Sequence, residues 1–370
     1  MKKVVVTGSD GFIGRNLMAR LNRIEDLEVA TITLGDSPES YEGKLKDADV
    51  IVHLAGVNRP KNVEEFVEGN TNLTQQLLDK VDKQLPPKFI ITSSAQAVLD
   101  NPYGHSKREA ELAVEEATKN KLIEGIIYRL PGVFGKWCLP NYNSVVATFC
   151  HNIAHGLPIE IRDSDYAVTL VYIDDVVASL IKHLDEPAQA GKLTRPEIST
   201  TFSITLGKLS ETLKSFKESR KNLRAPAVGD TLEKYLYSTY LSYLPRDQFS
   251  YPMELRTDNR GDLFEWIKSP DFGQVFVSTT KPGITRGNHF HHTKTEKFLV
   301  IRGEAVIRFR KIDETEVIEY PVSGDRPQVV DIPPGYTHNI TNTGESELIT
   351  LFWANEIFDQ ERPDTYFLEV

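Results

Sequence analysis

The sequence predicts two folds in one chain: a doubly wound sheet of parallel strands covered by helices, then an all-β domain. The first part alternates short runs rich in Val and Ile with amphipathic helical patterns, which is typical of a parallel sheet. A glycine-rich stretch directly follows the first apolar run. After Pro245 no long helical period remains, and short apolar runs separated by Gly, Pro, Asn and Asp indicate a sandwich or barrel.

The first half contains five apolar runs that we expect to be buried strands, because each is short and rich in β-branched residues. Helical periodicity in most of the intervals predicts helices on the faces of this sheet. Residues 207–244 also have a helical pattern. The strand runs are KKVVVTG, LEVATIT, ADVIVHLAG, KFIITSS and EGIIYRL, and helical patterns between them are FIGRNLMARLNRI, NTNLTQQLLDKVDK and YGHSKREAELAVEEATK.

The all-β part is predicted from the period-two and continuous apolar runs beyond residue 250. We place the domain boundary at Pro245, which gives a first domain of residues 1–245 and a second domain of residues 246–370. The strand runs of the second domain are GQVFVSTT, EKFLVIRG, EAVIRFRKI, TEVIEYPV, QVVDIPP and ELITLFWANE.

Composition excludes several classes of protein. The formal net charge of -10 disfavours nonspecific binding to nucleic acid or to anionic membranes. Two cysteines cannot build a disulfide framework and favour a reducing compartment. No apolar run approaches the roughly 18 residues of a membrane span. We therefore expect a cytoplasmic protein, and the acidic charge does not exclude small ligands that carry phosphate.

The glycine-rich stretch VVVTGSDGFIG predicts a phosphate-binding turn. Gly8, Gly11 and Gly14 follow a strand pattern and open a helix, together with Phe12 and Ile13. Glycine allows the tight turn and the close approach of a pyrophosphate to the free N–H groups at the helix start. A plain tight turn is the alternative.

The cofactor is predicted to be NADPH. In NAD-binding domains an acidic residue commonly ends the second strand and binds the ribose, whereas here Thr33 takes that position and Asp36 lies beyond it. A hydroxyl group with a nearby Arg15 suits the 2′-phosphate of NADP better, unless Arg15 is simply a solvated helix residue. The predicted cofactor-binding residues are Gly8, Gly11, Phe12, Ile13, Gly14, Arg15, Thr33, Tyr103 and Lys107.

The stretch NPYGHSK predicts the catalytic acid. Asn101 and Pro102 suit the start of a helix, and Tyr103 and Lys107 then share one helical face. A nearby ammonium favours the phenolate, so we expect it to lower the pKa of Tyr103. Ser93 and Ser94 end the preceding strand, and a hydroxyl group there can hydrogen bond to a reacting carbonyl. The alternative is a surface tyrosine beside a solvated lysine.

Residues 1 to about 244 resemble the extended short-chain dehydrogenase/reductase family that acts on sugar nucleotides, a family with a Rossmann-type fold. The matching stretches are TGSDGFIG, VIVHLAG, NTNLT, TSSAQA, YGHSK, YRLPGVFG and VYIDDV. The resemblance implies a catalytic triad of Ser94, Tyr103 and Lys107. In it Tyr103 exchanges a proton with the sugar oxygen, Lys107 holds the nicotinamide ribose, and Ser94 polarises the substrate oxygen.

The second domain contains a predicted metal site in the stretch GITRGNHFHHTKTE. On a strand His289 and His291 point to the same side, and a hairpin would bring Glu296 beside them. His338 follows a Pro-Gly turn. Three imidazoles and a carboxylate form a mixed site that suits zinc, iron, manganese or nickel, and of these we expect zinc. A polar pocket without metal is the alternative.

These residues resemble the two-part metal signature of the cupin family, which has a jelly-roll barrel. Gly283 and Gly303 complete the first half, and Pro333, Gly335 and Asn342 fit the second, whose leading glycine is replaced by Pro327. His292 is expected to face away from the site; the alternative is a locally irregular strand that exchanges it with His289 or His291. No general base is identified; Tyr336, Lys297 and His292 are candidates by proximity in sequence.

The pairing of the two domains resembles the bifunctional enzymes of capsular polysaccharide synthesis that form UDP-2-acetamido-2,6-dideoxy-β-L-talose. The resemblance implies that the cupin epimerises C3 of a UDP-linked 4-keto-hexosamine and that the first domain reduces C4 with NADPH. It further implies a homodimer formed through the cupin. The alternatives are a reductase whose cupin is only a structural or dimerisation module, a nucleotide-sensing regulatory protein, and a metal oxygenase.

Overall fold

The computed structural model describes residues 1–370 and divides into two compact units. The first unit comprises Met1–Lys214 and Asp230–Pro245, and the second comprises Ser215–Gly229 and Arg246–Val370. The predicted combination of a parallel α/β fold and an all-β fold is confirmed. None of the helices combines the length and the apolarity that crossing a membrane would require.

The sequence pattern assigned the segment Ser215–Gly229 to the first domain, whereas the structure groups it with the second unit. The backbones of Leu223 and Ala225 form hydrogen bonds with Lys268, of 2.9 Å and 2.8 Å. Arg224 and Lys268 form an isolated parallel bridge. These long-range contacts group the segment with the second unit, and a pattern of helical periodicity does not reveal them.

The main sheet of the first unit has six parallel strands in the order β2-β1-β3-β4-β5-β8. The strand order reverses between β1 and β3, and doubly wound sheets bind their ligands at the carboxyl ends of the strands beside this reversal. The strands are β1 (Lys2–Thr7), β2 (Leu27–Ile32), β3 (Val50–His53), β4 (Lys88–Ser94), β5 (Glu124–Leu130) and β8 (Leu193–Thr194).

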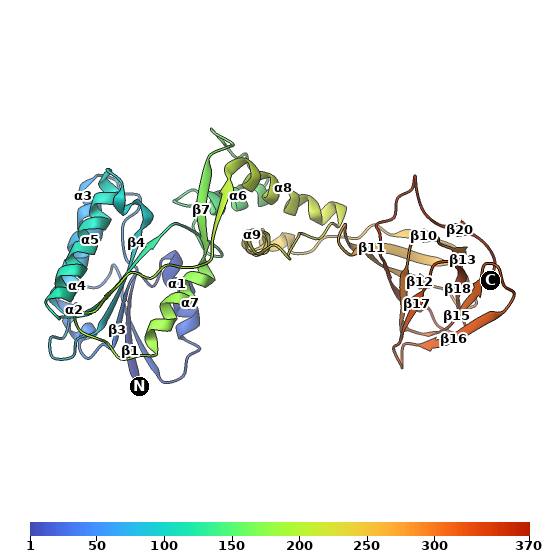
Figure 1. Ribbon diagram of the computed structural model, residues 1–370, viewed down its shortest axis with the longest axis horizontal. Coiled ribbons are helices and arrows are strands. Elements are labelled where there is room, and N and C mark those ends of the chain that lie inside the picture. Colours follow the sequence, from blue (N-terminus) through green and yellow to red (C-terminus); the bar gives the residue numbers. More distant parts are fainter. The chain divides into compact units, whose positions relative to one another are not determined.

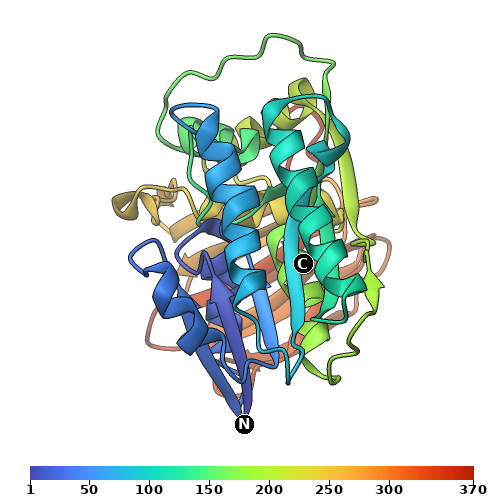
Figure 2. The same cartoon turned by 90° about the vertical axis from the view of Figure 1, so that its left-hand side faces the viewer.

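Helices cover both faces of this sheet (Figures 1 and 2). The helices α2, α4 and α5 lie on one face, and their apolar side chains form a buried core with those of the strands. The helices α1 and α7 contact each other on the opposite face. These five are α1 (Phe12–Leu21), α2 (Pro38–Leu45), α4 (Leu73–Asp79), α5 (Pro102–Lys119) and α7 (Ile173–Ile181).

The other elements up to Leu241 are a small sheet and further helices, of which α8 runs from the first unit into the second. A small sheet has the order β6-β7-β9. A short π-helical turn, Val67–Asn72, joins α3 to α4. The bounds are α3 (Glu64–Phe66), β6 (Gly132–Phe134), α6 (Val145–Ala154), β7 (Ala167–Tyr172), β9 (Thr201–Thr205), α8 (Leu206–Asn222) and α9 (Thr231–Leu241).

The second unit contains two antiparallel sheets, β10-β11-β12-β19-β14-β17 and β16-β15-β18-β13-β20. Apolar side chains from both sheets form one buried core. The strands are β10 (Arg256–Asp258), β11 (Gly261–Ser269), β12 (Gly273–Thr280), β13 (Thr285–Phe290), β14 (Glu296–Arg302), β15 (Glu304–Lys311), β16 (Val317–Ser323), β17 (Val329–Ile332), β18 (Tyr336–Asn342), β19 (Leu348–Ala354) and β20 (Tyr366–Phe367).

Candidate active site and candidate metal centre

The glycine loop lies where the main sheet reverses its strand order. Gly8 has φ +68°, and a Cβ atom there would lie 2.6 Å from the backbone nitrogen of Ala55, in the segment after β3. A Cβ atom on Gly14 would lie 2.1 Å from the carbonyl oxygen of Gly8. Gly11 caps helix α1, which begins at Phe12. Close backbone packing therefore requires the glycines, and the start of α1 can receive a pyrophosphate.

Asp36, just beyond the end of β2, is paired with neighbouring groups. The Asp36 carboxylate accepts hydrogen bonds from Lys44 Nζ at 2.5 Å and from the backbone N–H of Thr33 at 2.8 Å. The contact with Lys44 lowers the pKa of Asp36. Arg15 lies with its guanidinium 5.3 Å from the ring centre of Trp137. The Asp36 carboxylate is thus already paired.

Helix α5 begins where the sequence predicts. The Asn101 side chain accepts a hydrogen bond of 2.7 Å from Gly104 N–H, and Pro102 is the first helical residue. A Cβ atom on Gly104 would lie 2.4 Å from the carbonyl oxygen of Gln96. This tight contact packs the first turn of α5 against the chain that follows β4, the strand that ends with Ser94.

The structure brings Ser94, Tyr103 and Lys107 to the carboxyl end of β4. Burial raises the pKa of Tyr103, and a hydrogen bond with Ser94 only partly offsets this effect. Lys107 Nζ donates a 2.9 Å hydrogen bond to the carbonyl oxygen of Thr92. Burial also lowers the pKa of Lys107 to about 8, although the Glu111 carboxylate opposes this shift.

The direction of the Tyr103 pKa shift corrects the sequence expectation. Helical spacing suggested that Lys107 would make the phenol more acidic. In the structure the phenol is largely removed from water, which disfavours the phenolate, and the ammonium is bonded to a backbone carbonyl instead. In this state Tyr103 is therefore a protonated acid at neutral pH.

Asn70 is a buried residue of this site to which sequence reasoning assigned no role. Its side chain accepts a hydrogen bond from Val57 N–H at 2.9 Å and donates to Ser106 Oγ at 3.0 Å. A Cβ atom on Gly56 would lie 2.7 Å from Asn70 Oδ1 and 3.6 Å from Lys107 Nζ. Asn70 therefore joins the loop after β3 to α5. Its only sequence signal was its place in the stretch NTNLT.

His53 is a second buried residue that the sequence did not single out. Its ring nitrogens lie 2.7 Å from Thr7 Oγ1 and 3.0 Å from Thr74 Oγ1. Burial lowers the pKa of His53 to about 3, and the Lys107 charge acts in the same direction. The neutral imidazole thus connects the ends of β1 and β3 with α4, and its partner Thr7 directly precedes Gly8 of the glycine loop.

A cleft of about 460 Å³ lies in the first unit and can accept a ligand of small-molecule size. Arg59 donates to the carbonyl oxygen of Asn141 at 3.4 Å across it. Tyr142 is close enough to Tyr103 for its charge to raise the Tyr103 pKa. The cleft therefore lies near Tyr103. Its lining residues are Arg59, Asn141, Tyr142, Asn143, Ser144, Val145, Thr148 and Phe149.

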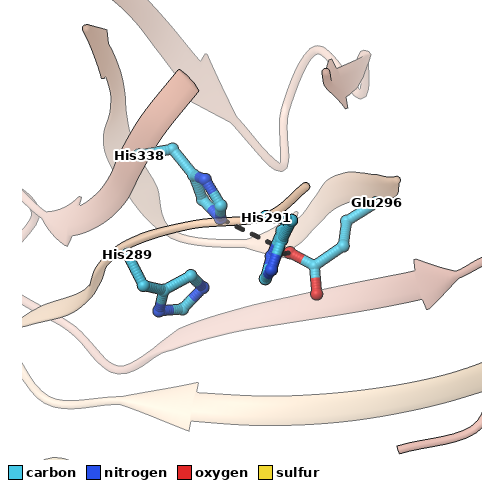
Figure 3. A group of neighbouring side chains, drawn as sticks. All are labelled: His289, His291, Glu296 and His338. Atoms are coloured by element: carbon cyan, nitrogen blue, oxygen red, sulfur yellow. Dashed lines mark ion pairs between the residues drawn. The ribbon is translucent and has the colours of Figure 1, made fainter. Parts of the chain in front are cut away.

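The second unit brings the four predicted metal ligands together (Figure 3). Their ligand atoms, from His289, His291, Glu296 and His338, lie within 4.8 Å of one another. The Nε2 atoms of His291 and His338 each lie 3.4 Å from Glu296 Oε2. His291, Glu296 and His338 are buried, and His289 is partly exposed.

These distances fit a bound divalent ion. Two ligand atoms held at about 2.1 Å from a tetrahedral zinc ion stand about 3.4 Å apart. The Nε2 atoms of His291 and His338 are buried without a hydrogen-bond partner, a costly state that a metal bond removes. The Nδ1 atoms lie 2.7 Å from the Asp364 carbonyl oxygen and 3.3 Å from the Tyr336 carbonyl oxygen.

The charge states also fit a metal. Burial raises the pKa of Glu296, but the rings of His291 and His338 more than offset this, so the pKa ends well below its ordinary value. Burial lowers the pKa of His289 to about 3, and His338 adds to the effect. The cluster therefore presents a carboxylate and an unprotonated His289 at neutral pH, as metal binding requires.

A bulge in β13 shapes this cluster. The register with β18 shifts between Gly287 and His289, and Asn288 has φ +59°. The shift leaves His289 opposite His338. Phe290 faces away and stacks on Tyr366. The sequence predicted the alternation of His289, Phe290 and His291, but it did not reveal the bulge.

Two of the three candidate bases lie outside the cluster. Lys297 is exposed and paired with Asp331 at 2.5 Å. His292 is exposed and packs edge-on against Tyr366. Tyr336 packs against the apolar core of the unit. Lys294, which the sequence did not suggest, is 6% exposed, and its charge lowers the pKa of His289.

Both halves of the chain match known protein families. Residues 4–198 match the model of the NAD dependent epimerase/dehydratase family, and residues 256–366 match that of the polysaccharide biosynthesis C-terminal domain. UDP-2-acetamido-2,6-beta-L-arabino-hexul-4-ose reductase from Pseudomonas aeruginosa is 46% identical over all of this chain and 99% of its own.

Solved structures are similar over the whole chain. The capsular polysaccharide assembling protein CapF from Staphylococcus aureus is 46% identical, with a TM-score of 0.90 over 99% of this chain and 100% of its own. A structure of CapF with the inhibitor 3-isopropenyl-tropolone is 42% identical, with a TM-score of 0.84 and full coverage of both chains. The chain therefore belongs to the NAD dependent epimerase/dehydratase family, in the branch that continues into a polysaccharide biosynthesis C-terminal domain.

Proposed function

We propose that the first unit reduces the C4 ketone of a UDP-linked 4-keto-hexosamine. The observation that carries this proposal is the placement of Ser94, Tyr103 and Lys107 at the carboxyl end of β4, in the same fold as a glycine loop at the reversal of strand order. The full-length similarity to a hexul-4-ose reductase supports the choice of a 4-keto sugar nucleotide.

Each residue of the triad has one task in this reaction. NADPH, when bound, supplies the hydride that is added to C4. Tyr103 donates its phenolic proton to the oxygen that becomes the C4 hydroxyl group, and its raised pKa keeps that proton available at neutral pH. Ser94 donates a hydrogen bond to the same oxygen, and the Lys107 ammonium binds the nicotinamide ribose.

NADPH is proposed over NADH on the basis of the residues at the end of β2. Asp36 is paired with Lys44 and with the Thr33 N–H, so its carboxylate is not free to bind a ribose hydroxyl. The Thr33 hydroxyl, which donates to Asp36 at 3.2 Å in this structure, would turn to a 2′-phosphate, and Arg15 of α1 would supply a cation. A comparison of kcat/KM for the two cofactors, in the wild type and in Arg15→Ala, tests this assignment.

The substrate nucleotide is proposed to occupy the cleft beside Tyr103. Arg59 supplies a cation for the diphosphate, and Tyr142 supplies an aromatic face for a base. Asn141 and Asn143 add amide groups for hydrogen bonds to sugar or base. Arg59→Ala is expected to raise KM for the UDP-sugar while leaving the affinity for NADPH unchanged.

A second activity, epimerisation at C3, is proposed for the second unit. The proton on a carbon beside a ketone is acidic, and exchange of that proton from the other face inverts the centre. His289, His291, Glu296 and His338 would hold a divalent ion, with zinc the best fit to the donor set. Such an ion supplies Lewis-acid polarisation of a carbonyl oxygen.

A dimerisation module is the second candidate role for the second unit. Strand β16 is an edge strand of its sheet and exposes Val317, Ile318 and Tyr320. An exposed apolar edge strand is a typical pairing surface. We propose a homodimer through this strand, and the mass in solution of the wild type and of Ile318→Lys tests it.

The assay for the proposed function supplies a UDP-4-keto-hexosamine and NADPH and follows NADPH oxidation together with the sugar product. If the sugar is reduced at C4 but its C3 proton is not exchanged, the reductase assignment stands. The second unit then has a structural or dimerisation role. Exchange without reduction would contradict the role of the triad.

A further inference from the structure

Asp364 is joined to the ligand-bearing loop of the candidate metal centre by five hydrogen bonds. Its carbonyl oxygen lies 2.7 Å from Nδ1 of the buried His291. Its carboxylate accepts the backbone N–H groups of His292, Thr293 and Lys294 at 3.0, 2.8 and 2.9 Å, and the Thr293 hydroxyl at 3.0 Å. One residue therefore contacts a ligand and the loop that leads to the next ligand.

The segment around Asp364 is attached to the metal centre on both sides. The buried Lys294 donates from Nζ to the Pro363 carbonyl oxygen at 3.2 Å and to Thr365 Oγ1 at 2.8 Å. Strand β20 pairs with β13, so that Phe367 lies opposite His289. Leu368 N–H donates to the Asn288 carbonyl oxygen at 3.0 Å. The segment 363–368 thus contacts strand β13, which provides His289, and the loop after it, which begins with His291.

We propose that Asp364 is a positioning residue of the metal centre and sets its affinity for the ion. This inference rests on the proposed metal binding. With Nδ1–H donated to the Asp364 carbonyl oxygen, the lone pair of His291 lies on Nε2, the atom directed at Glu296. The carboxylate holds the loop from His292 to Lys294 in one conformation, so that Glu296 needs no reordering when the ion binds.

A purely structural role makes a different prediction. If Asp364 only capped the loop, its loss would change local stability, and metal affinity would stay the same. If its carboxylate positions the loop that leads to Glu296, loss of the carboxylate disorders this loop in the metal-free protein, and ordering it on binding weakens the affinity. Partners of this kind around metal ligands typically change metal affinity by about 10- to 100-fold.

Two variants separate these roles. Asp364→Asn keeps the side-chain volume, and Asn readily adopts the positive φ of this position, +38°. It replaces one acceptor oxygen of the carboxylate by an NH₂ group that faces N–H donors. Asp364→Gly removes the side chain without backbone strain. Asp359→Asn is the matched control, because Asp359 lies in the same region and caps only Glu361 N–H, at 2.9 Å.

The experiment uses the full chain with Zn²⁺ or Co²⁺ alone as the probe. Competition with a chelator gives the affinity, the Co²⁺ absorption bands report the ligand geometry, and hydrogen exchange of residues 292–296 in the metal-free protein reports loop order. We expect both Asp364 variants to lose about 10- to 100-fold in affinity, to change the Co²⁺ bands and to lose amide protection. Asp359→Asn should match the wild type in all three measurements.

Three outcomes would overturn the inference. Wild-type affinity in both Asp364 variants, with lower amide protection, would reduce Asp364 to a loop cap. Unchanged affinity and protection would remove both roles. A wild-type chain that binds neither ion would contradict the proposed metal centre and the effect on affinity with it, while hydrogen exchange still decides separately whether Asp364 orders the loop.

Discussion

Lys107 donates a 2.9 Å hydrogen bond from Nζ to the carbonyl oxygen of Thr92, at the carboxyl end of β4. The bond holds the ammonium in a buried position where no carboxylate neutralises it directly. Burial accordingly lowers its pKa to about 8. The charge of this lysine, which we propose to bind the nicotinamide ribose, therefore changes within an experimentally accessible pH range.

The affinity for NADPH should fall as the pH rises through about 8. Lys107 is charged below its lowered pKa and neutral above it, so the hydrogen bond from the ammonium to the ribose weakens on the alkaline side. A charge-assisted hydrogen bond of about 1.5 kcal/mol corresponds to roughly a tenfold change in Kd. Fluorescence titration of NADPH at pH values on both sides of 8 measures it. Lys107→Met should bind weakly at every pH, and a wild-type Kd that stays constant would refute this role.

Tyr103→Phe should remove reduction and weaken NADPH binding only slightly, because Lys107 and the glycine loop still hold the cofactor. The phenol is the proposed proton donor, and loss of such a group costs about 10²- to 10⁴-fold in rate. NADPH oxidation and NADPH titration measure the two effects. Tyr166→Phe is the control, since Tyr166 is 60% exposed. If Tyr103→Phe reduced the sugar at the wild-type rate, Tyr103 would not be the acid.

Gly14→Ala should abolish NADPH binding and destabilise the first unit by about 1 to 3 kcal/mol, as expected of overpacking. The added Cβ atom would lie 2.1 Å from the Gly8 carbonyl oxygen, so the loop must move. Gly43→Ala in α2 is the matched control, because no atom lies within 4 Å of its added Cβ. It should be neutral or stabilising by up to about 1 kcal/mol. Calorimetry and NADPH titration check both, and equal behaviour of the two variants would contradict the packing argument.

The chain should bind one divalent ion, and chelation should lower the melting temperature of the second unit. An ion present at a hundred times its Kd stabilises the folded state by about 2.7 kcal/mol. His338→Ala should eliminate the ion in elemental analysis, because this ring is fully buried and lies 3.4 Å from Glu296. The exposed His292 provides the control, and His292→Ala should keep the ion. Loss of the ion in both variants, or in neither, would count against the assigned ligand set.

Local sequence patterns predicted the parts of both sites that depend on neighbours in the chain. The glycine loop, the start of α5 at Asn101 and the alternation of His289 and His291 each follow from spacing over a few residues. The fold class followed from the change in periodicity near Pro245. In these cases the backbone conformation is set by the residues themselves.

Other features depend on contacts between distant residues, which one sequence does not reveal. The Asp364 carbonyl oxygen reaches His291 across 73 positions. Asn70 acts through Val57 and Ser106 in two other segments. The pKa of Tyr103 depends on burial in the folded protein, and this outweighed the lysine that helical spacing had placed nearby. Burial of this kind is known only when the packing of all elements is known.

The most direct test of two activities in one chain is deuterium incorporation at C3. The wild type is incubated with a UDP-4-keto-hexosamine in deuterated water without NADPH, and the sugar is examined by NMR. We predict that deuterium appears at C3 in the wild type and in Tyr103→Phe, and that it does not appear in His338→Ala. A C3 position that keeps its proton in the wild type would contradict the epimerase assignment, and exchange that persists in His338→Ala would contradict the role of the metal centre.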